Sequence, residues 1–137
     1  MRVMVMVRAT AESEAGVLPG AQRLAEMGRF NERLAGAGVL LAADRLQSSA
    51  HGARVRFSGS RRRVVEGPFA QAGELIAGFW LWQVRSLDEA IEWAKRCPDL
   101  FDGESELELR QVCGAEYAGA APATGPATRR PRLRSEP

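Results

Sequence analysis

The sequence predicts an α+β sandwich in which two helices cover one face of a four-stranded sheet. Three observations predict it: two strands that are apolar on both faces, two amphipathic helical segments, and a short alternating segment between them. In chain order the expected elements are strand, helix, strand, hairpin, strand, helix and strand. This is the order of a ferredoxin-like sandwich with an inserted β-hairpin.

The first third of the chain is expected to supply a central strand, a helix and a second strand. Residues 2–9 place valines on one face and methionines on the other, which is typical of a strand covered on both sides. Residues 10–18 read as a loop, and residues 39–46 as the second strand. Between them a helix is expected to begin near Pro19 and to end at Gly36. The apolar residues at helical spacing are Leu24, Met27, Phe30 and Leu34.

A hairpin is expected next, after the turn-rich residues 48–52. Residues 53–57 alternate, so Ala53, Val55 and Phe57 are predicted to face inward and the two arginines outward. Residues 61–66 are the expected partner strand of this hairpin.

Residues 79–84 form the strand around which the chain is organised. Trp80, Trp82 and Val84 share one face, because side chains alternate along a strand. The opposite face carries Phe79 and Leu81 and is therefore also bulky and apolar. Two helices can cover only one face of the sheet, so we expect an identical sheet to cover the other face in a homodimer with a barrel-like core.

A second helix should follow at once and end before Pro98. Ser86 and Glu89 have capping-box spacing. The expected buried stripe is Leu87, Ala90, Ile91 and Ala94. Residues 106–112 are the last expected strand.

Composition and charge limit which classes of protein and which domain organisations are compatible with the sequence. We expect one domain over residues 1–113 and a disordered Ala/Pro/Arg-rich tail over residues 114–137. A net charge of +2 does not by itself indicate a polyanionic partner. The two cysteines are too few for a disulfide framework or a zinc site, so we expect a cytoplasmic protein without metal or cofactor. No apolar run approaches the length of a membrane span, and residues 1–7 are too short for a signal peptide.

The sequence also resembles a known family. The tetrapeptide Glu66-Gly67-Pro68-Phe69 is similar to the Asp-Gly-Pro-Phe (DGPF) signature of one branch of the YCII-related family. The resemblance extends over residues 1–113, through the segments 37–47, 52–59, 64–69, 74–84 and 86–98. It implies a dimeric α/β barrel. Most members of the branch are uncharacterised, and some are encoded beside sigma factors.

The resemblance says less about chemistry. Some YCII relatives are suspected enzymes with a His–Asp pair in the barrel cleft, and at least one acts on a chlorinated aromatic compound. The histidine would fall on the first helix, where this chain has none, and the aspartate would fall near Cys97. Neither residue of the pair is therefore carried over to this sequence.

Two residues are candidate acid–base catalysts. Glu66 ends a strand before a Gly-Pro turn, and His51 is the only histidine of the chain. Both also have ordinary structural interpretations, Glu66 as a cap of the turn and His51 as an exposed loop residue. The candidate ligand-binding residues are Arg8, Phe69, Trp80 and Trp82.

Three functions remain open from the sequence. The first is a small-molecule-binding homodimer with little or no catalysis. The second is an acid–base enzyme that acts on a small substrate, aromatic or otherwise, through Glu66, with Arg8 or His51 assisting. The third is a regulatory protein that contacts a sigma factor or nucleic acid through the arginines of its tail, although a solvated tail is favoured.

Overall fold

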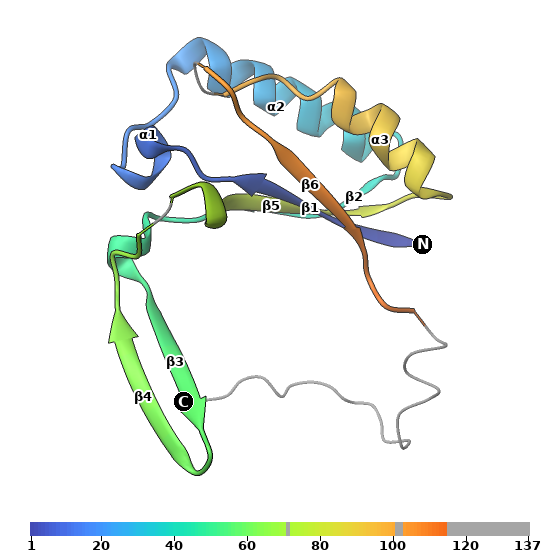
Figure 1. The fold of residues 1–137 in the computed structure, drawn as a ribbon. Helices are drawn as coiled ribbons and strands as arrows, with labels where there is room; N and C mark the ends of the chain where they lie inside the picture. Colours follow the sequence, from blue (N-terminus) through green and yellow to red (C-terminus); the bar gives the residue numbers. More distant parts are fainter. Residues whose placement is uncertain (71, 101–102, 115–137) are drawn as a thin grey trace.

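An antiparallel four-stranded sheet lies at the centre of the computed structural model, which describes residues 1–70, 72–100 and 103–114 (Figure 1). Its order is β2-β5-β1-β6, and each strand is antiparallel to its neighbour. The strands are β1 (Arg2–Arg8), β2 (Leu40–Arg45), β5 (Ile76–Gln83) and β6 (Leu107–Gln111). The predicted α+β class and the central position of the first and third of these strands are confirmed. The sheet is open, with β2 and β6 at its edges, and the described strands close no barrel.

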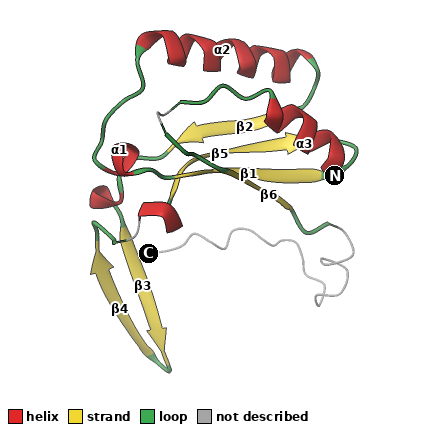
Figure 2. Cartoon of the chain, turned by 45° about the horizontal axis from the view of Figure 1, so that its top comes forward, coloured by secondary structure: helices red, strands yellow, loops and turns green. Residues whose placement is uncertain are grey.

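Both long helices cover the same face of this sheet (Figure 2). They are α2 (Ala21–Gly36) and α3 (Leu87–Lys95). Trp80 and Trp82 of β5 point to this face, and both make edge-to-face contacts with Phe30 of α2. The remaining buried side chains of this core include Val3, Val5, Leu34, Val39, Val84 and Ala90. Trp80 and Trp82 share one face as predicted, and the structure shows that this face is the one covered by the helices.

The opposite face of the sheet carries no helix among the described residues (Figure 1). Met4 and Met6 of β1 pair in register with Leu81 and Phe79 of β5. These four side chains form an apolar centre that is only partly buried. We call this surface the open face. The sequence correctly predicted that the open face is apolar. The described residues of a single chain do not cover this face.

A two-stranded hairpin projects from the sheet on the side away from the helices (Figure 1). It consists of β3 (Ala53–Ser58) and β4 (Arg61–Glu66), close to the predicted bounds. The prediction that Ala53, Val55 and Phe57 face inward is wrong, because every residue of β3 is exposed. The hairpin forms a separate sheet that does not pack on the core. The apolar and polar side chains that alternate along β3 therefore lie on two faces that are both exposed to solvent.

Two further predictions need correction. The segment expected to be a loop over residues 10–18 contains a short helix, α1 (Ala11–Glu14), which Thr10 and Ser13 stabilise through a reciprocal capping box. In α3 the expected stripe is rotated: Leu87 and Ile91 are 42% and 38% exposed. Ala90 and Ala94 pack on the core as predicted, and Trp93 and Cys97, which follows the helix, pack there in place of Leu87 and Ile91.

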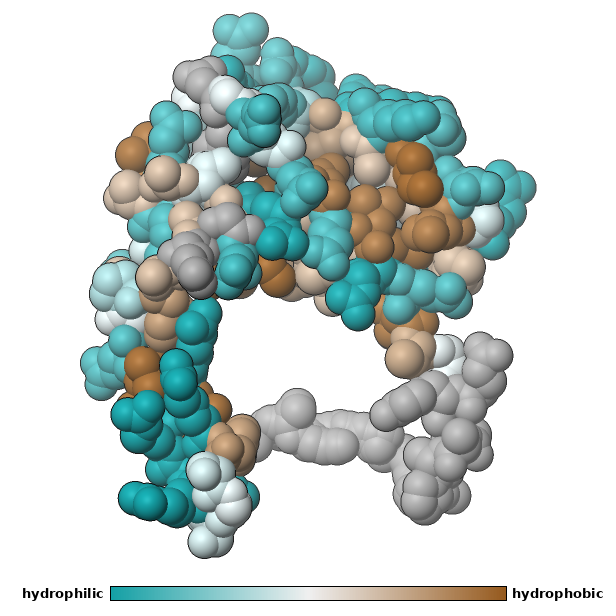
Figure 3. All heavy atoms as spheres, in the orientation of Figure 1, coloured by the Kyte–Doolittle hydropathy of each residue, from teal (hydrophilic) through white to brown (hydrophobic). Residues whose placement is uncertain are grey.

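Polar residues cover α2 and much of the hairpin, and hydrophobic side chains gather where α3 meets the sheet (Figure 3). Within the described ranges, no helix has both the length and the apolar character needed to cross a membrane. From residue 115 onward, the predicted tail lies outside the described part of the chain.

Candidate functional site

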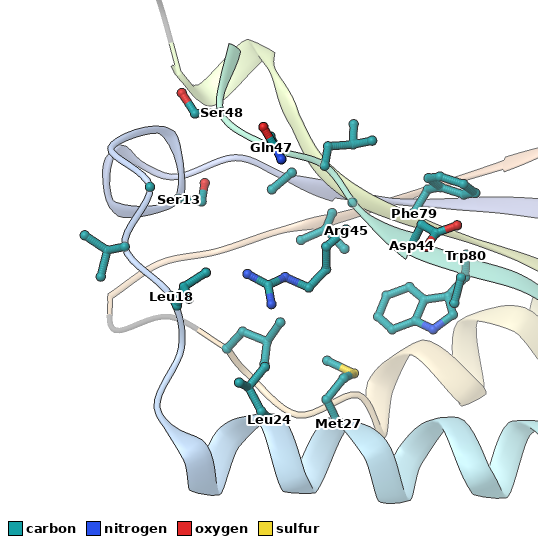
Figure 4. A pocket seen from close by; sticks show the side chains of 18 of the residues that line it. Ser13, Leu18, Leu24, Met27, Asp44, Arg45, Gln47, Ser48, Phe79 and Trp80 are labelled. Carbon is teal, nitrogen blue, oxygen red and sulfur yellow. The ribbon is translucent and has the colours of Figure 1, made fainter. Parts of the chain in front are cut away.

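A cavity lies between the first turns of α2, the end of β2 and the start of β5 (Figure 4). Its volume is about 820 Å³, within the usual range for small-molecule sites. Apolar side chains supply one wall, from the loop after α1, from α2 and from the sheet. They include Val7, Leu18, Leu24, Met27, Ala43 and Trp80.

Arg45 brings a positive charge into this cavity. It is the last residue of β2 and pairs with Gly78 of β5, which places it on the same side of the sheet as Trp80. Figure 4 shows its side chain extending toward Leu18 and Leu24. Within the described chain, the Arg45 guanidinium has no hydrogen bond and no ion pair.

Gly78 allows β2 to run close to β5 at this point. A β-carbon added to Gly78 would lie 3.0 Å from the carbonyl oxygen of Asp44 and 3.4 Å from the α-carbon of Arg45. Glycine therefore lets the backbone of Arg45 approach the wall that carries Trp80.

The indole of Trp80 is fixed by α2. Its Nε1 donates a hydrogen bond of 2.7 Å to Oδ1 of Asn31, and both residues line the cavity. This bond satisfies the polar atom of an otherwise buried side chain and sets the plane of the ring.

A polar rim completes the opening of the cavity. Ser48 and His51 come from the 3-10 turn region that includes η1 (Ser49–His51), and Ser13 comes from α1. The carboxylate of Glu14 accepts hydrogen bonds from the backbone N–H and the hydroxyl of Ser49. These bonds lower the pKa of Glu14 and tie α1 to η1.

The same serine anchors the signature segment. Ser49 Oγ accepts a hydrogen bond of 2.9 Å from the backbone N–H of Phe69, and Gly67 donates its N–H to the carbonyl of Gly52. The peptide bond between Gly67 and Pro68 is cis. The Gly-Pro-Phe segment thus joins the root of the hairpin to the rim of the cavity.

The structure brings together only two of the six residues proposed from the sequence: His51 and Trp80 both line the cavity. Trp82 is fully buried in the core, where its Nε1 has no hydrogen-bond partner among the described residues. Phe69 lies beneath the guanidinium of Arg54, 3.9 Å from ring centroid to carbon, and is not a lining residue.

The other two sequence-proposed residues lie elsewhere. Arg8 is on the open-face side of β1 and forms an ion pair of 2.7 Å with Glu108 of β6. Glu66 is exposed at the end of β4, opposite Ala53 in the hairpin, and does not line the cavity.

Cys97 is a partly buried thiol whose raised pKa disfavours the reactive thiolate. Burial, with a smaller contribution from the Asp99 carboxylate, raises its pKa to about 12. In residues 1–70, 72–100 and 103–114, no three histidine, cysteine or acidic side chains are grouped closely enough to hold a metal ion.

The cavity also contains Arg45, Leu18 and Met27, which were not predicted as site residues. One signal was available for Arg45: in the strand predicted over residues 39–46 it alternates with Ala43, so it belongs to the face that packs on α2. Leu18 precedes the helix in a segment without periodicity, and no pattern in the sequence places it.

Comparison with known proteins identifies the family. The model of the YCII-related domain matches residues 1–112, so the chain belongs to the YCII-related domain family. It is also similar to the uncharacterized protein R00369 of Rhizobium meliloti (strain 1021), with 33% identity over 76 residues. That match covers 56% of this chain and spans 61% of the relative. The function of this YCII-related protein is not established by either similarity.

Proposed function

We propose that the protein is a homodimer that binds a small molecule in the cavity beside Arg45 and catalyses little or no reaction. The cavity itself is the observation that carries this proposal. It combines a volume of about 820 Å³, an apolar wall and a few polar groups, which is the usual make-up of a ligand site.

The open face supports the dimer. Its centre of Met4, Met6, Phe79 and Leu81 is apolar and carries no helix in the described chain. A contiguous apolar surface of this kind is a common basis for self-association.

A second copy of the chain is the simplest cover for the open face. A two-fold axis in the plane between the sheets brings the same apolar centre of both copies together, so each copy covers the other. Two sheets packed in this way would enclose the barrel-like core expected of a dimeric α/β barrel.

The signature segment and the cysteines support two narrower assignments. We infer membership of the DGPF branch from Glu66-Gly67-Pro68-Phe69, whose glycine and phenylalanine backbone atoms tie the hairpin to the cavity rim. We infer a cytoplasmic location from Cys97 and Cys113, which are both free thiols.

One observation favours the acid–base enzyme as a second candidate: His51 lines the cavity. Imidazole is the commonest general base in enzymes, and Ser48 lies on the same rim. In this candidate His51 acts on a bound substrate, and Glu66 would have to approach through the hairpin of a second copy.

Native mass spectrometry of freshly purified full-length protein tests the main proposal. A mass of two chains that carries a small non-covalent adduct is expected, and a monomer at micromolar concentration contradicts the dimer. The adduct, once identified, is then offered to the wild type and to His51→Ala and Glu66→Gln. Unchanged ligand after incubation with wild type supports binding without catalysis, whereas turnover that both variants lose supports the enzyme.

A further inference from the structure

The geometry of the cavity assigns its ligand to one chemical class, and this inference rests on the proposed function. We propose that the cavity binds a monocarboxylate whose body is an aromatic or branched hydrocarbon group, with the carboxylate on the guanidinium of Arg45.

Among the described residues that line the cavity, Arg45 is the arginine, and its side chain lies on the helix side of the sheet. In the described chain it forms no hydrogen bond or ion pair, although its side chain extends into the cavity (Figure 4). A guanidinium in this position presents several N–H donors in a plane, which match the two oxygens of a carboxylate.

Asp44 also lines the cavity but does not neutralise Arg45. It is the preceding residue of β2, so its side chain projects to the other side of the sheet, where it pairs in register with Phe79. Figure 4 shows Asp44 beside Phe79. No ion pair joins it to Arg45 within the described residues. The positive charge on the helix side is therefore available to a ligand.

A single guanidinium favours a single negative charge on that ligand. Apart from Asp44, which projects to the other side of the sheet, and His51 on the rim, the other polar lining residues are uncharged donors or acceptors such as Ser13, Gln47 and Ser48. A phosphate dianion is normally held by several cations or by a helix N-terminus. The described lining of this cavity contains neither.

The wall beyond Arg45 determines the body of the ligand. Leu18, Leu24 and Met27 face the guanidinium, and the Trp80 ring lies along the sheet behind it (Figure 4). The bond from Trp80 to Asn31 holds the indole in place, so this surface is preformed. Such a surface favours a planar aromatic ring or a branched alkyl group over a sugar or a peptide.

The test uses two probes of equal shape and different charge, 2-naphthoate and the neutral 2-naphthamide. Each is titrated into the full-length protein by isothermal calorimetry. The carboxylate should bind at least about tenfold more tightly than the amide, as expected for a hydrogen-bonded charge pair in a partly apolar site. Arg45→Gln should remove this preference by weakening 2-naphthoate alone.

Arg63→Gln is the matched control, because it removes an equal charge from the exposed hairpin strand β4, away from the cavity. It should retain the preference of the wild type. Equal binding of both probes to wild type, or a preference that survives Arg45→Gln, overturns the assignment of ligand class and leaves the cavity as a binding site. Binding of neither probe to wild type counts against both the ligand class and the cavity as a small-molecule site.

Discussion

The α-carbon of Gly67 lies against the backbone of Ser49, so that a β-carbon on the glycine would sit 1.7 Å from the Ser49 carbonyl oxygen. Gly67 precedes the Pro68-Phe69 pair, and Ser49 holds both the carboxylate of Glu14 and the N–H of Phe69. The signature segment is therefore a structural joint between hairpin, α1 and cavity rim. Its glycine is required by a close backbone approach.

Gly67→Ala should destabilise the fold, because the added methyl group meets backbone atoms that cannot move aside without breaking this joint. The expected loss is about 3 kcal/mol, as for overpacking of a tight contact. Urea unfolding followed by circular dichroism measures it. Gly28→Ala is the control: Gly28 lies within α2 with open space around it, so alanine should stabilise by about 1 kcal/mol. Equal stability of Gly67→Ala and wild type would show that the backbone around residue 67 can shift to accommodate a methyl group, and would contradict the requirement for glycine.

Met6→Glu should abolish the proposed dimer. Met6 pairs with Phe79 at the centre of the open face, and a carboxylate there would be buried between two sheets and directly opposite the carboxylate of Glu108. Sedimentation equilibrium should show a monomer with unchanged circular dichroism. Leu87→Glu is the control, because Leu87 is 42% exposed in the first turn of α3, where an acidic side chain is tolerated. A dimeric, folded Met6→Glu would exclude the open face as the interface.

Asn31 should contribute to stability through Trp80. Removing the acceptor in Asn31→Ala leaves the indole N–H without its 2.7 Å hydrogen bond, which should cost about 1 kcal/mol. In a Trp80→Phe background the same substitution should cost measurably less, since phenylalanine has no donor. A double-mutant cycle by urea unfolding gives the coupling energy. Additive effects of the two substitutions would mean that the bond does not stabilise the folded state.

Cys97 should resist alkylation that Cys113 undergoes. The pKa of Cys97 is raised to about 12 by burial and by Asp99, whereas Cys113 is exposed. Iodoacetamide at pH 8.5 should therefore label Cys113 in the folded protein and both cysteines in urea, as read by peptide mass spectrometry. Rapid labelling of Cys97 in the folded protein would contradict its burial.

The same shift predicts a pH dependence of stability. From about pH 9 upward the unfolded chain loses the Cys97 proton, while the folded protein retains it until about pH 12. The free energy of unfolding should fall as pH rises through this window. Cys97→Ala should reduce the slope, and an identical slope in that variant would rule out this thiol as a contributor.

Local periodicity in the sequence was sufficient to predict the two central strands and the longer helix. Trp80 and Trp82 share a buried face because side chains alternate along a strand, and this rule holds wherever the strand lies. The apolar face of Met4 and Met6 followed from the same rule. The capping serine of α3, Ser86, was also readable, because an N-cap bond joins residues three apart in the sequence.

Tertiary structure decided the burial of the hairpin, the rotation of α3 and the content of the site. Alternation in β3 shows two faces, but only packing determines whether either face is covered, and in this chain neither is. Arg45, Leu18 and Met27 meet in one cavity although they come from three separate segments. Gly67 and Ser49 are likewise brought together by the fold.

The sequence by itself therefore determined the α+β class, the order of the main elements and the two-sided apolar character of β1 and β5. Each of these depends on interactions between residues a few positions apart. The position of the cavity and its charge depend on contacts between segments that are far apart in the sequence. No local sequence pattern specifies the geometry of such contacts. Glu66 and His51 illustrate the difference: both stand near turns in the sequence, yet only His51 lies on the wall of the cavity.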